Sequence, residues 1–329
     1  MSGCSTITTL FPRCLTSFLF AYTGIVTILS VDVVPSELIA LVVLGLIVLC
    51  LYTYAKVIYS GAGSPLDFPE LRINDIQAAE DGIELPPRFL SQRSFTLKHN
   101  GRFRFCRTCR VWKPDRCHHC SACNKCFLKM DHHCPWFPVC IGFNNQKYFM
   151  QFLIYTTFYA IMIFYLSGSQ ILNWIKEKQY ERETINLPLL VVWLLSVVIS
   201  ISLIAFTSYT GYMLTRNQTT IEMYEHTYKR DQLEVYNDSR RIENESSENI
   251  FDLGSRIANW ECVMGRSWLE LLLPMPRKAQ VQSRHTLEEK GLFFKVNNDV
   301  YQAINTSRDL QEQLMRRLTP RSSSEANRF

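Results

Sequence analysis

Four long apolar runs alternate with polar stretches along the chain. They cover residues 14–34, 37–59, 148–172 and 185–214. Each is long enough to cross roughly 30 Å of hydrocarbon as a helix that rises about 1.5 Å per residue. We therefore expect two transmembrane hairpins. A cleavable signal peptide is a poor alternative for the first run, since no strongly basic segment precedes it and a second run follows at once.

The polar stretches divide the remainder of the chain. We expect a tail at 1–12, spans within 13–60, a linker at 61–100, a cysteine-rich domain at 101–147, spans within 148–214, a C-terminal region at 215–276 and a disordered tail at 277–329. Residues 225–248 are highly charged and predict a loop or a surface helix. Residues 249–276 carry short apolar bursts, which favour a small packed element or an interfacial helix.

Charge orients the spans. The net charge is +5, and residues 61–147 hold 13 Lys and Arg against 8 Asp and Glu. Because basic loops stay on the cytosolic side, this segment and, with four spans, both termini should be cytosolic. Nucleic-acid binding is a weaker interpretation, since the basic residues lie beside a span and no recognition helix follows.

Residues 106–140 hold eight of the twelve cysteines and four of the seven histidines. Paired cysteines with histidines among them are typical of zinc ligands, and such thiolates need a reducing compartment. Eight ligands suit two Cys3His zinc sites, whose binding energy would fold a segment that is poor in large apolar groups. The spacing leaves the pairing of ligands open. The ligands are Cys106, Cys109, His119, Cys120, Cys123, Cys126, His133 and Cys140.

Two cysteines of this segment remain after the zinc ligands are assigned, Cys117 and Cys134. Cys134 follows Asp131 and His132, so it could be a nucleophile with His132 as the base and Asp131 orienting the ring. A ninth ligand or a buried thiol is the alternative. The third span begins about fourteen residues later, so we expect the thiol at the membrane surface, where it could exchange an acyl group with a long-chain thioester.

These motifs resemble those of the DHHC protein S-palmitoyltransferases. The resemblance covers the cysteine-rich domain, including the sequence from Asp131 to Trp136. The residues Thr219, Thr220 and Glu222 match the family's TTxE motif. Residues 249–254, followed by Asn259, are similar to its C-terminal aromatic motif. Within the family, residues 111–120 are most similar to the fungal vacuolar-membrane member.

The resemblance implies an all-α integral membrane protein with four transmembrane helices and a cytosolic two-zinc domain between spans 2 and 3. It implies that palmitoyl-CoA acylates Cys134, which then passes the palmitoyl group to a cysteine of a membrane-associated protein. It also implies interleaved zinc sites. One would use Cys106, Cys109, His119 and Cys126, and the other Cys120, Cys123, His133 and Cys140.

Further roles follow from the same resemblance. Thr219 and Thr220 would approach Asp131, and Asn249 or Asn259 would brace the C-terminal element. The acyl cavity would be lined by Trp136, Phe152 and Tyr159, although Tyr159 could equally be a packing aromatic. Candidate cations for the CoA phosphates are Arg104, Lys113, Arg116 and His118, whose alternative is a merely basic cytosolic face.

The chain departs from the family at two positions. Val139 stands where the family often has Asn, and Cys117 where it usually has Ser. A membrane-anchored zinc adaptor without catalysis is the competing function, and a spare Cys134 argues against it. The vacuolar membrane is the location that the narrower resemblance implies, with Golgi or endoplasmic reticulum as alternatives.

Overall fold

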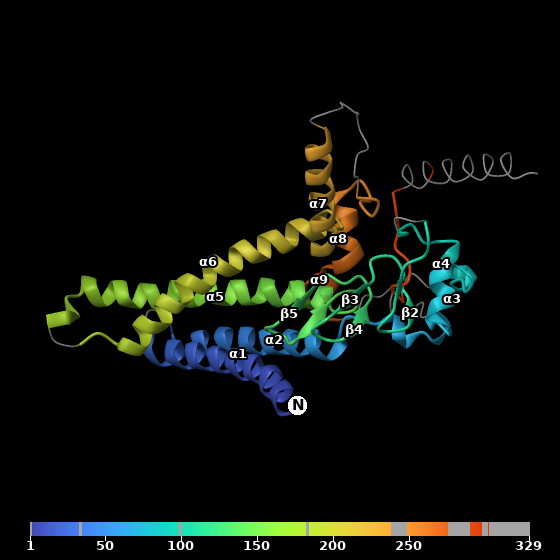
Figure 1. Cartoon of the computed structure of the whole chain (residues 1–329). Helices are drawn as coiled ribbons and strands as arrows, with labels where there is room; N and C mark the ends of the chain where they lie inside the picture. Colours follow the sequence, from blue (N-terminus) through green and yellow to red (C-terminus); the bar gives the residue numbers. More distant parts are fainter. Residues whose placement is uncertain are drawn as a thin grey trace, which may run out of the picture.

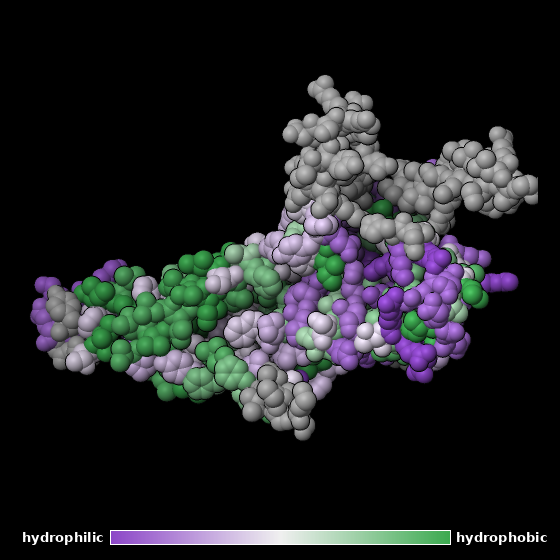
Figure 2. All heavy atoms as spheres, viewed as in Figure 1, coloured by the Kyte–Doolittle hydropathy of each residue, from purple (hydrophilic) through white to green (hydrophobic). Residues whose placement is uncertain are grey.

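The computed structural model describes residues 2–32, 35–98, 101–181, 184–237, 249–275, 290–297 and 302. Its body consists of four long helices that are apolar enough to cross a membrane. They are α1 (Ser2–Ser30), α2 (Ser36–Ser60), α5 (Gln146–Lys176) and α6 (Leu187–Thr215). Figure 1 shows them side by side, with the cysteine-rich segment at one end, and Figure 2 shows apolar side chains over their surface. The four-span prediction is confirmed.

Helix α1 is longer than the apolar run that predicts it. It begins at Ser2, so most of the expected tail at 1–12 is helical, and its segment Thr9–Ser30 is apolar enough to span. Backbone hydrogen bonds can continue a helix beyond its apolar run, which is why the sequence pattern alone placed its start too late. Pro12 cannot donate one of these bonds, and the N-terminal end of α1 bends in Figure 1.

Helix α5 is the central span and packs against both α2 and α6. Its buried aromatics form one core with α1 and α2, to which Phe20, Tyr54, Phe152 and Tyr159 belong. The Tyr159 hydroxyl lies 2.8 Å from that of Thr23, so α1 and α5 also share a polar contact inside this core. A short 3-10 helix, η3 (Gln179–Glu181), follows α5.

The stretch between the second span and the cysteine-rich domain is more ordered than the irregular linker we expected. It contains η1 (Pro65–Asp67), η2 (Pro69–Leu71), α3 (Ile76–Asp81) and α4 (Arg88–Ser91). Side-chain caps start two of them, from Ser64 and Asp75. Leu71 and Leu90 are buried against Trp112, so this segment covers one side of the cysteine-rich domain.

The cysteine-rich domain consists of three short antiparallel hairpins. Strand β1 (Phe105–Cys106) pairs with β2 (Val111–Trp112), β3 (His118–Cys120) with β4 (Lys125–Phe127), and β5 (His132–Cys134) with β6 (Val139–Ile141). These hairpins are the only strands within the described ranges, so the fold remains predominantly helical. A two-stranded hairpin is marginally stable by itself, which makes cross-links between the three necessary.

The region after the fourth span folds back onto the start of α5. It contains α7 (Thr220–Asn237), α8 (Arg256–Met264) and α9 (Trp268–Leu272), so the charged stretch is helical as far as Asn237, and 238–248 lie outside the described residues. Three residues of one α5 face bind the backbone carbonyls at the end of α9. Lys147 and Gln151 donate to them at 2.9–3.2 Å, and Tyr155 donates to Leu272.

A last described segment, residues 290–297, crosses the cysteine-rich domain, and we name it the C-terminal strap. Leu292 and Phe293 are buried with Leu90, and the ring of Phe294 packs edge-on against Phe143. The prediction of a disordered tail at 277–329 was wrong for this segment, because its successive apolar residues bury against the domain. Apart from Gln302, the remainder of that stretch lies outside the described residues.

Candidate metal centres and active site

Eight Cys and His residues gather into two clusters of four. One contains Cys106, Cys109, His119 and Cys126, and the other Cys120, Cys123, His133 and Cys140, with all ligand atoms of a cluster within 4.8 Å of one another. The histidine uses Nδ1 in both. Its distances to the three sulfur atoms are 3.6, 3.3 and 3.7 Å in the first cluster, and 3.7, 3.3 and 3.7 Å in the second.

These distances fit a tetrahedral zinc ion. Zinc bonds of about 2.3 Å to sulfur and 2.0–2.1 Å to nitrogen make the edges of the tetrahedron about 3.6–3.8 Å long. Three thiolates and one imidazole are also the softer ligands that zinc prefers over calcium or magnesium. Each cluster could therefore hold one zinc ion, and together they agree with the interleaved pairing that the family resemblance implied.

Strand geometry explains how one hairpin serves both clusters. Side chains alternate between the two faces of a strand. On β3 this sends His119 to the first cluster and Cys120 to the second. His119 lies directly across from Cys126, as His133 does from Cys140. The middle hairpin thus supplies two ligands to each cluster and joins the other two hairpins.

A repeat in the sequence, which the initial pattern reading missed, predicts the same pairing. Every ligand of the second cluster stands 14 positions after its counterpart in the first. Cys134 follows Cys120 by the same 14 positions, but Phe137 stands where a second cysteine would complete the pair. Cys134 therefore occupies a ligand position of an incomplete third unit, and Phe137 is buried instead among the aromatics of α2 and α5.

Strand β5 also arranges the candidate catalytic residues. Alternation places His132 and Cys134 on one face, and His133 faces the second metal cluster. The His132 Nδ1 atom lies 2.7 Å from Asp131 Oδ2, and His132 also hydrogen-bonds the Cys134 thiol. Cys134 is buried, and the His132 ring packs edge-on against Phe149 at the start of α5. The candidate nucleophile, base and orienting carboxylate of a Cys-His-Asp triad therefore lie in contact.

Electrostatics favour an imidazolium and a carboxylate in this triad. Burial opposes charge on His132, but the hydrogen bonds to Asp131 and Cys134 outweigh it and raise the pKa of His132 to about 9. Burial likewise opposes charge on Asp131, yet the contacts with His132 and Thr220 lower the pKa of its carboxyl group. The imidazole is thus basic enough to take the thiol proton.

The TTxE motif contacts the triad through one threonine only. Thr220 donates to Asp131 Oδ1 from its backbone amide at 2.7 Å and from its hydroxyl at 3.0 Å. Thr219 does not reach Asp131. Its amide donates to Glu222 Oε2 at 2.9 Å, and its hydroxyl accepts from the Glu222 amide at 3.3 Å. The two threonines at the start of α7 therefore bind different carboxylates, Thr220 that of Asp131 and Thr219 that of Glu222.

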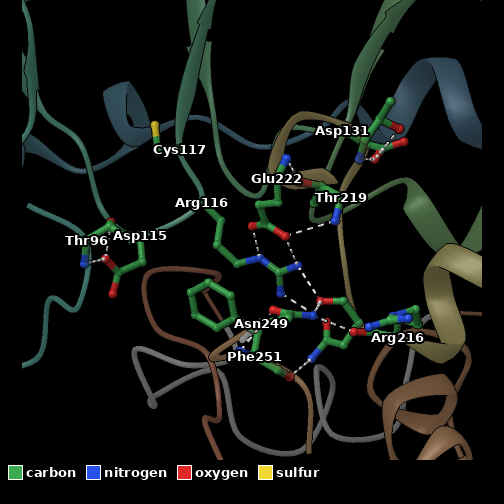
Figure 3. Close-up of polar contacts among 12 residues, drawn as sticks. Thr96, Asp115, Arg116, Cys117, Asp131, Arg216, Thr219, Glu222, Asn249 and Phe251 are labelled. Atoms are coloured by element: carbon green, nitrogen blue, oxygen red, sulfur yellow. Dashed lines mark hydrogen bonds and ion pairs between the residues drawn. The ribbon is translucent and has the colours of Figure 1, made fainter. Parts of the chain in front are cut away.

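Arg116 is not available to a phosphate, contrary to the expectation that it could contact CoA. It is 2% exposed, and its guanidinium donates to both carboxylate oxygens of Glu222 at 2.7 and 2.9 Å. It also donates to the side chain and backbone carbonyls of Asn217. The rings of Phe251 and Phe294 lie 4.4 and 5.2 Å from it. Figure 3 shows this guanidinium directed toward the carboxylate of Glu222.

The other candidate cations differ in availability. Arg104 donates to Thr96 and to the Cys117 carbonyl, and so it is engaged within the domain. Burial, together with the nearby Arg104 and Lys113, lowers the pKa of His118 to about 4, so this residue is neutral at pH 7. The half-buried Lys113 side chain makes no hydrogen bond or ion pair in the described part of the chain, although its charge acts on Cys106 and His118, and it stays a candidate for binding a phosphate.

The candidate acyl-cavity residues lie at different depths. Phe152 is in the aromatic core below the triad, against Phe137 and Tyr54, whereas Tyr159 lies deeper and contacts α1. Trp136 is 57% exposed, so its ring marks the surface beside Cys134. Tyr54, which the sequence reading missed, donates its hydroxyl to the Trp136 carbonyl at 2.7 Å and links α2 to the active-site loop.

Both candidate asparagines brace the C-terminal region. Asn249 Nδ2 donates to the Arg216 carbonyl at 2.6 Å, and Asn259 Nδ2 donates to the Thr215 carbonyl at 2.9 Å. Asn259 also bonds Asp252 and the Leu253 amide. The last turn of α6 is thereby joined to α8 and to the segment that precedes α8.

Comparison with known proteins extends this picture. The model of the DHHC palmitoyltransferase family matches residues 99–227. Palmitoyltransferase PFA3 of Saccharomyces cerevisiae is 51% identical over 323 residues, covering 98% of this chain and 96% of that protein. The corresponding protein of Kluyveromyces lactis is 47% identical over 315 residues, 96% of this chain and 97% of that protein. Palmitoyltransferase ZDHHC15 of Rattus norvegicus is 35% identical over 211 residues, 61% of this chain and 60% of that protein.

Fold and site together define a multi-span membrane enzyme in which a free thiol stands beside two zinc-type clusters. The chain belongs to the DHHC palmitoyltransferase family. Its donor substrate is accordingly a palmitoyl thioester, for which palmitoyl-CoA fits the family.

Proposed function

We propose that this protein transfers a palmitoyl group from palmitoyl-CoA to cysteines of membrane-associated proteins through an acyl intermediate on Cys134. The supporting observation is the distribution of thiols. Eight ligands form two complete clusters, and Cys134 stays outside both while hydrogen-bonding His132, which in turn bonds Asp131. A zinc adaptor without catalysis would need no such triad.

The triad can perform the transfer in two balanced steps. His132 takes the Cys134 proton while the sulfur attacks the thioester carbonyl; the bond from carbon to the CoA sulfur breaks, and CoA leaves with that proton. In the second step His132 takes the proton of the substrate cysteine, whose sulfur attacks the acyl-Cys134 thioester. Cys134 leaves and recovers the proton. Asp131 stabilises the imidazolium in both steps.

Zinc would have a structural part in this mechanism. Ions at the two clusters would hold the three hairpins together, and His133 as a ligand would fix β5 beside the nucleophile. No proton or acyl transfer is assigned to the metals.

The test is to incubate the purified protein with labelled palmitoyl-CoA and then treat it with hydroxylamine. We expect a hydroxylamine-labile label in the natural protein and none in Cys134→Ser, with zinc near two per chain in both. Label that persists in the variant would contradict the mechanism. Loss of zinc from Cys134→Ser would instead make this cysteine a ligand and favour the adaptor.

We further propose that the cysteine-rich domain and both termini face the cytosol and that the membrane is the fungal vacuole. The basic excess of residues 61–147 supports the first point, and the narrower family resemblance supports the second. Protease treatment of intact vacuoles should remove a C-terminal tag, and a protected tag would contradict the orientation.

A further inference from the structure

The cytosolic end of α1 carries a cation to the active-site loop. Arg13 and Thr16 are three positions apart and so lie on neighbouring parts of one helix face. The Thr16 side chain contacts the Tyr54 hydroxyl, and both Arg13 and Cys134 lie within electrostatic range of that hydroxyl. Because the same hydroxyl donates to the Trp136 carbonyl, the end of α1 lies against the loop that follows Cys134.

Arg13 has a buried hydrogen-bond donor without an acceptor. Its Nε atom is enclosed by protein and unpaired, and within the described residues its guanidinium makes no hydrogen bond or ion pair. A buried unpaired donor costs about 1–3 kcal/mol, and a charged one more. An arginine that merely follows the positive-inside rule would extend its guanidinium to water, which leaves an enclosed Nε unexplained. The position therefore suits an acceptor that arrives with a ligand.

The reacting thioester supplies such acceptors. When its carbonyl carbon meets Cys134, the acyl chain can enter the aromatic core of α1, α2 and α5. On the CoA side, the thioester sulfur is attached to the pantetheine arm. The amide carbonyls of this arm lie between the sulfur and the phosphates of CoA. A planar guanidinium with several N–H groups can donate to neighbouring carbonyl oxygens.

We propose that Arg13 binds the acyl donor at this point, donating hydrogen bonds to the carbonyl oxygens of the thioester and the pantetheine arm. This proposal rests on the proposed function of Cys134 as the acyl acceptor. It adds a residue of the first span to a donor site otherwise built from the cysteine-rich domain and α5. Arg13 directly precedes the first apolar run, and the sequence alone gave no sign of such a role.

The experiment compares the natural protein with Arg13→Gln and Arg13→Lys in detergent, following thiol release at increasing donor concentration. The donors are palmitoyl-CoA and S-palmitoyl-pantetheine, which keeps the carbonyls and lacks the nucleotide phosphates. We expect Arg13→Gln to raise KM about tenfold for both donors, the loss of a charge-assisted hydrogen bond. Arg13→Lys should lie between the two. Lys56→Gln is the matched control. It removes another cation near the end of α2, but the Lys56 ammonium already lies over the Tyr52 ring, so neither KM should change.

Four outcomes separate the interpretations. An unchanged KM in Arg13→Gln overturns the proposal. A rise with palmitoyl-CoA alone shows that Arg13 binds a phosphate of CoA, which also overturns it. A rise only in phospholipid nanodiscs assigns Arg13 to a lipid headgroup, with the same consequence. Absence of thiol release from the natural protein would instead contradict the proposed function. If Arg13→Gln does not fold, as judged by zinc near two per chain, Arg13→Lys gives the decision.

Discussion

At the scale of single residues, the free thiol and the buried cation have different origins. Cys134 is free because Phe137 fills the position of a second cysteine in its unit, so the thiol faces His132 and makes no cluster. Arg116 is buried because acceptors and rings surround it on all sides: Glu222, Asn217, Phe251 and Phe294. Cys134 is the proposed nucleophile, and Arg116 holds together the parts of the chain around it.

Breaking the Arg116–Glu222 pair should destabilise the cytosolic region strongly. Arg116→Gln leaves the Glu222 carboxylate buried and unpaired, for which about 3–5 kcal/mol is expected. We expect a clear fall in the temperature of zinc release on heating. Acylation should fall as well, because Glu222 lies on the turn that carries Thr220 to Asp131.

Arg107→Gln is the matched control for this prediction. It removes a guanidinium that pairs with Glu80 on the surface of the same domain, where the Arg107 side chain is 75% exposed. Exposed pairs contribute about 0–1 kcal/mol. Equal shifts for the two variants would show that burial of Arg116 does not determine its contribution.

The two Cys and His clusters and the contact between His132 and Asp131 could be predicted from sequence because these residues are neighbours along the chain. The pattern from Cys106 to Cys140 places each ligand type at a spacing that hairpins can satisfy. The role of Arg116 could not, because its partners lie more than 100 residues later, from Asn217 onward. A lone arginine beside zinc ligands suggests a phosphate contact equally well, and only the fold decides between these roles.

At the scale of elements, the three hairpins form a series joined by metal. The middle hairpin has ligands on both faces, the first only for the first cluster and the third only for the second. Loss of one metal should therefore release one outer hairpin and leave the other attached. The element that carries Cys134 depends directly on the second cluster alone.

Cys109→Ala and Cys123→Ala test this order, since they occupy equivalent positions in the two clusters. Each should reduce zinc from near two to near one per chain, because a structural site contributes roughly 10–16 kcal/mol only with its ligands complete. Cys123→Ala should abolish acylation, because β5 loses its anchor at His133. Cys109→Ala should retain measurable acylation. Simultaneous loss of both metals in either variant would show that the hairpins fold as one unit.

The four spans were predictable because each is long and apolar, whereas the ordered elements at 61–98 were not. The short helices there contain few apolar residues, such as Leu71 and Leu90, and these become informative only when they pack against Trp112. The contacts between α5 and α9 could not be predicted either, for a different reason. They are hydrogen bonds to backbone carbonyls, which leave no pattern in the sequence.

At the scale of the whole molecule, the C-terminal strap contacts cytosolic segments that the third and fourth spans separate along the sequence. It contacts the segment before the cysteine-rich domain through Phe89, the domain through Phe143, and the region after the fourth span through Phe251. The Phe294 ring also covers Arg116. The strap is a short apolar stretch within a polar tail, so its sequence did not predict a tertiary contact of this extent.

Leu292→Ala should measure how much the strap stabilises the cytosolic region. Leu292 is 1% exposed, and truncating such a side chain costs about 2–5 kcal/mol. We expect zinc release at a lower temperature than in the natural protein. Lys295→Ala is the control within the strap, since Lys295 is exposed and should have no effect. Equal behaviour of the two variants would contradict the packed strap.

The position of the strap near the C-terminal end of the sequence also determines the order in which contacts around Cys134 can form during synthesis. Cys134 leaves the ribosome before the third and fourth spans, whereas Phe294 follows it by 160 residues. At 5–20 residues per second, about 8 to 32 s separate the two. During that interval the hairpins can bind metal, but Arg116 lacks first Glu222 and then the covering ring. The surroundings of Cys134 are therefore complete only after the C-terminal strap has been synthesised. A product truncated before the strap would contain Cys134 without the contacts that stabilise its domain.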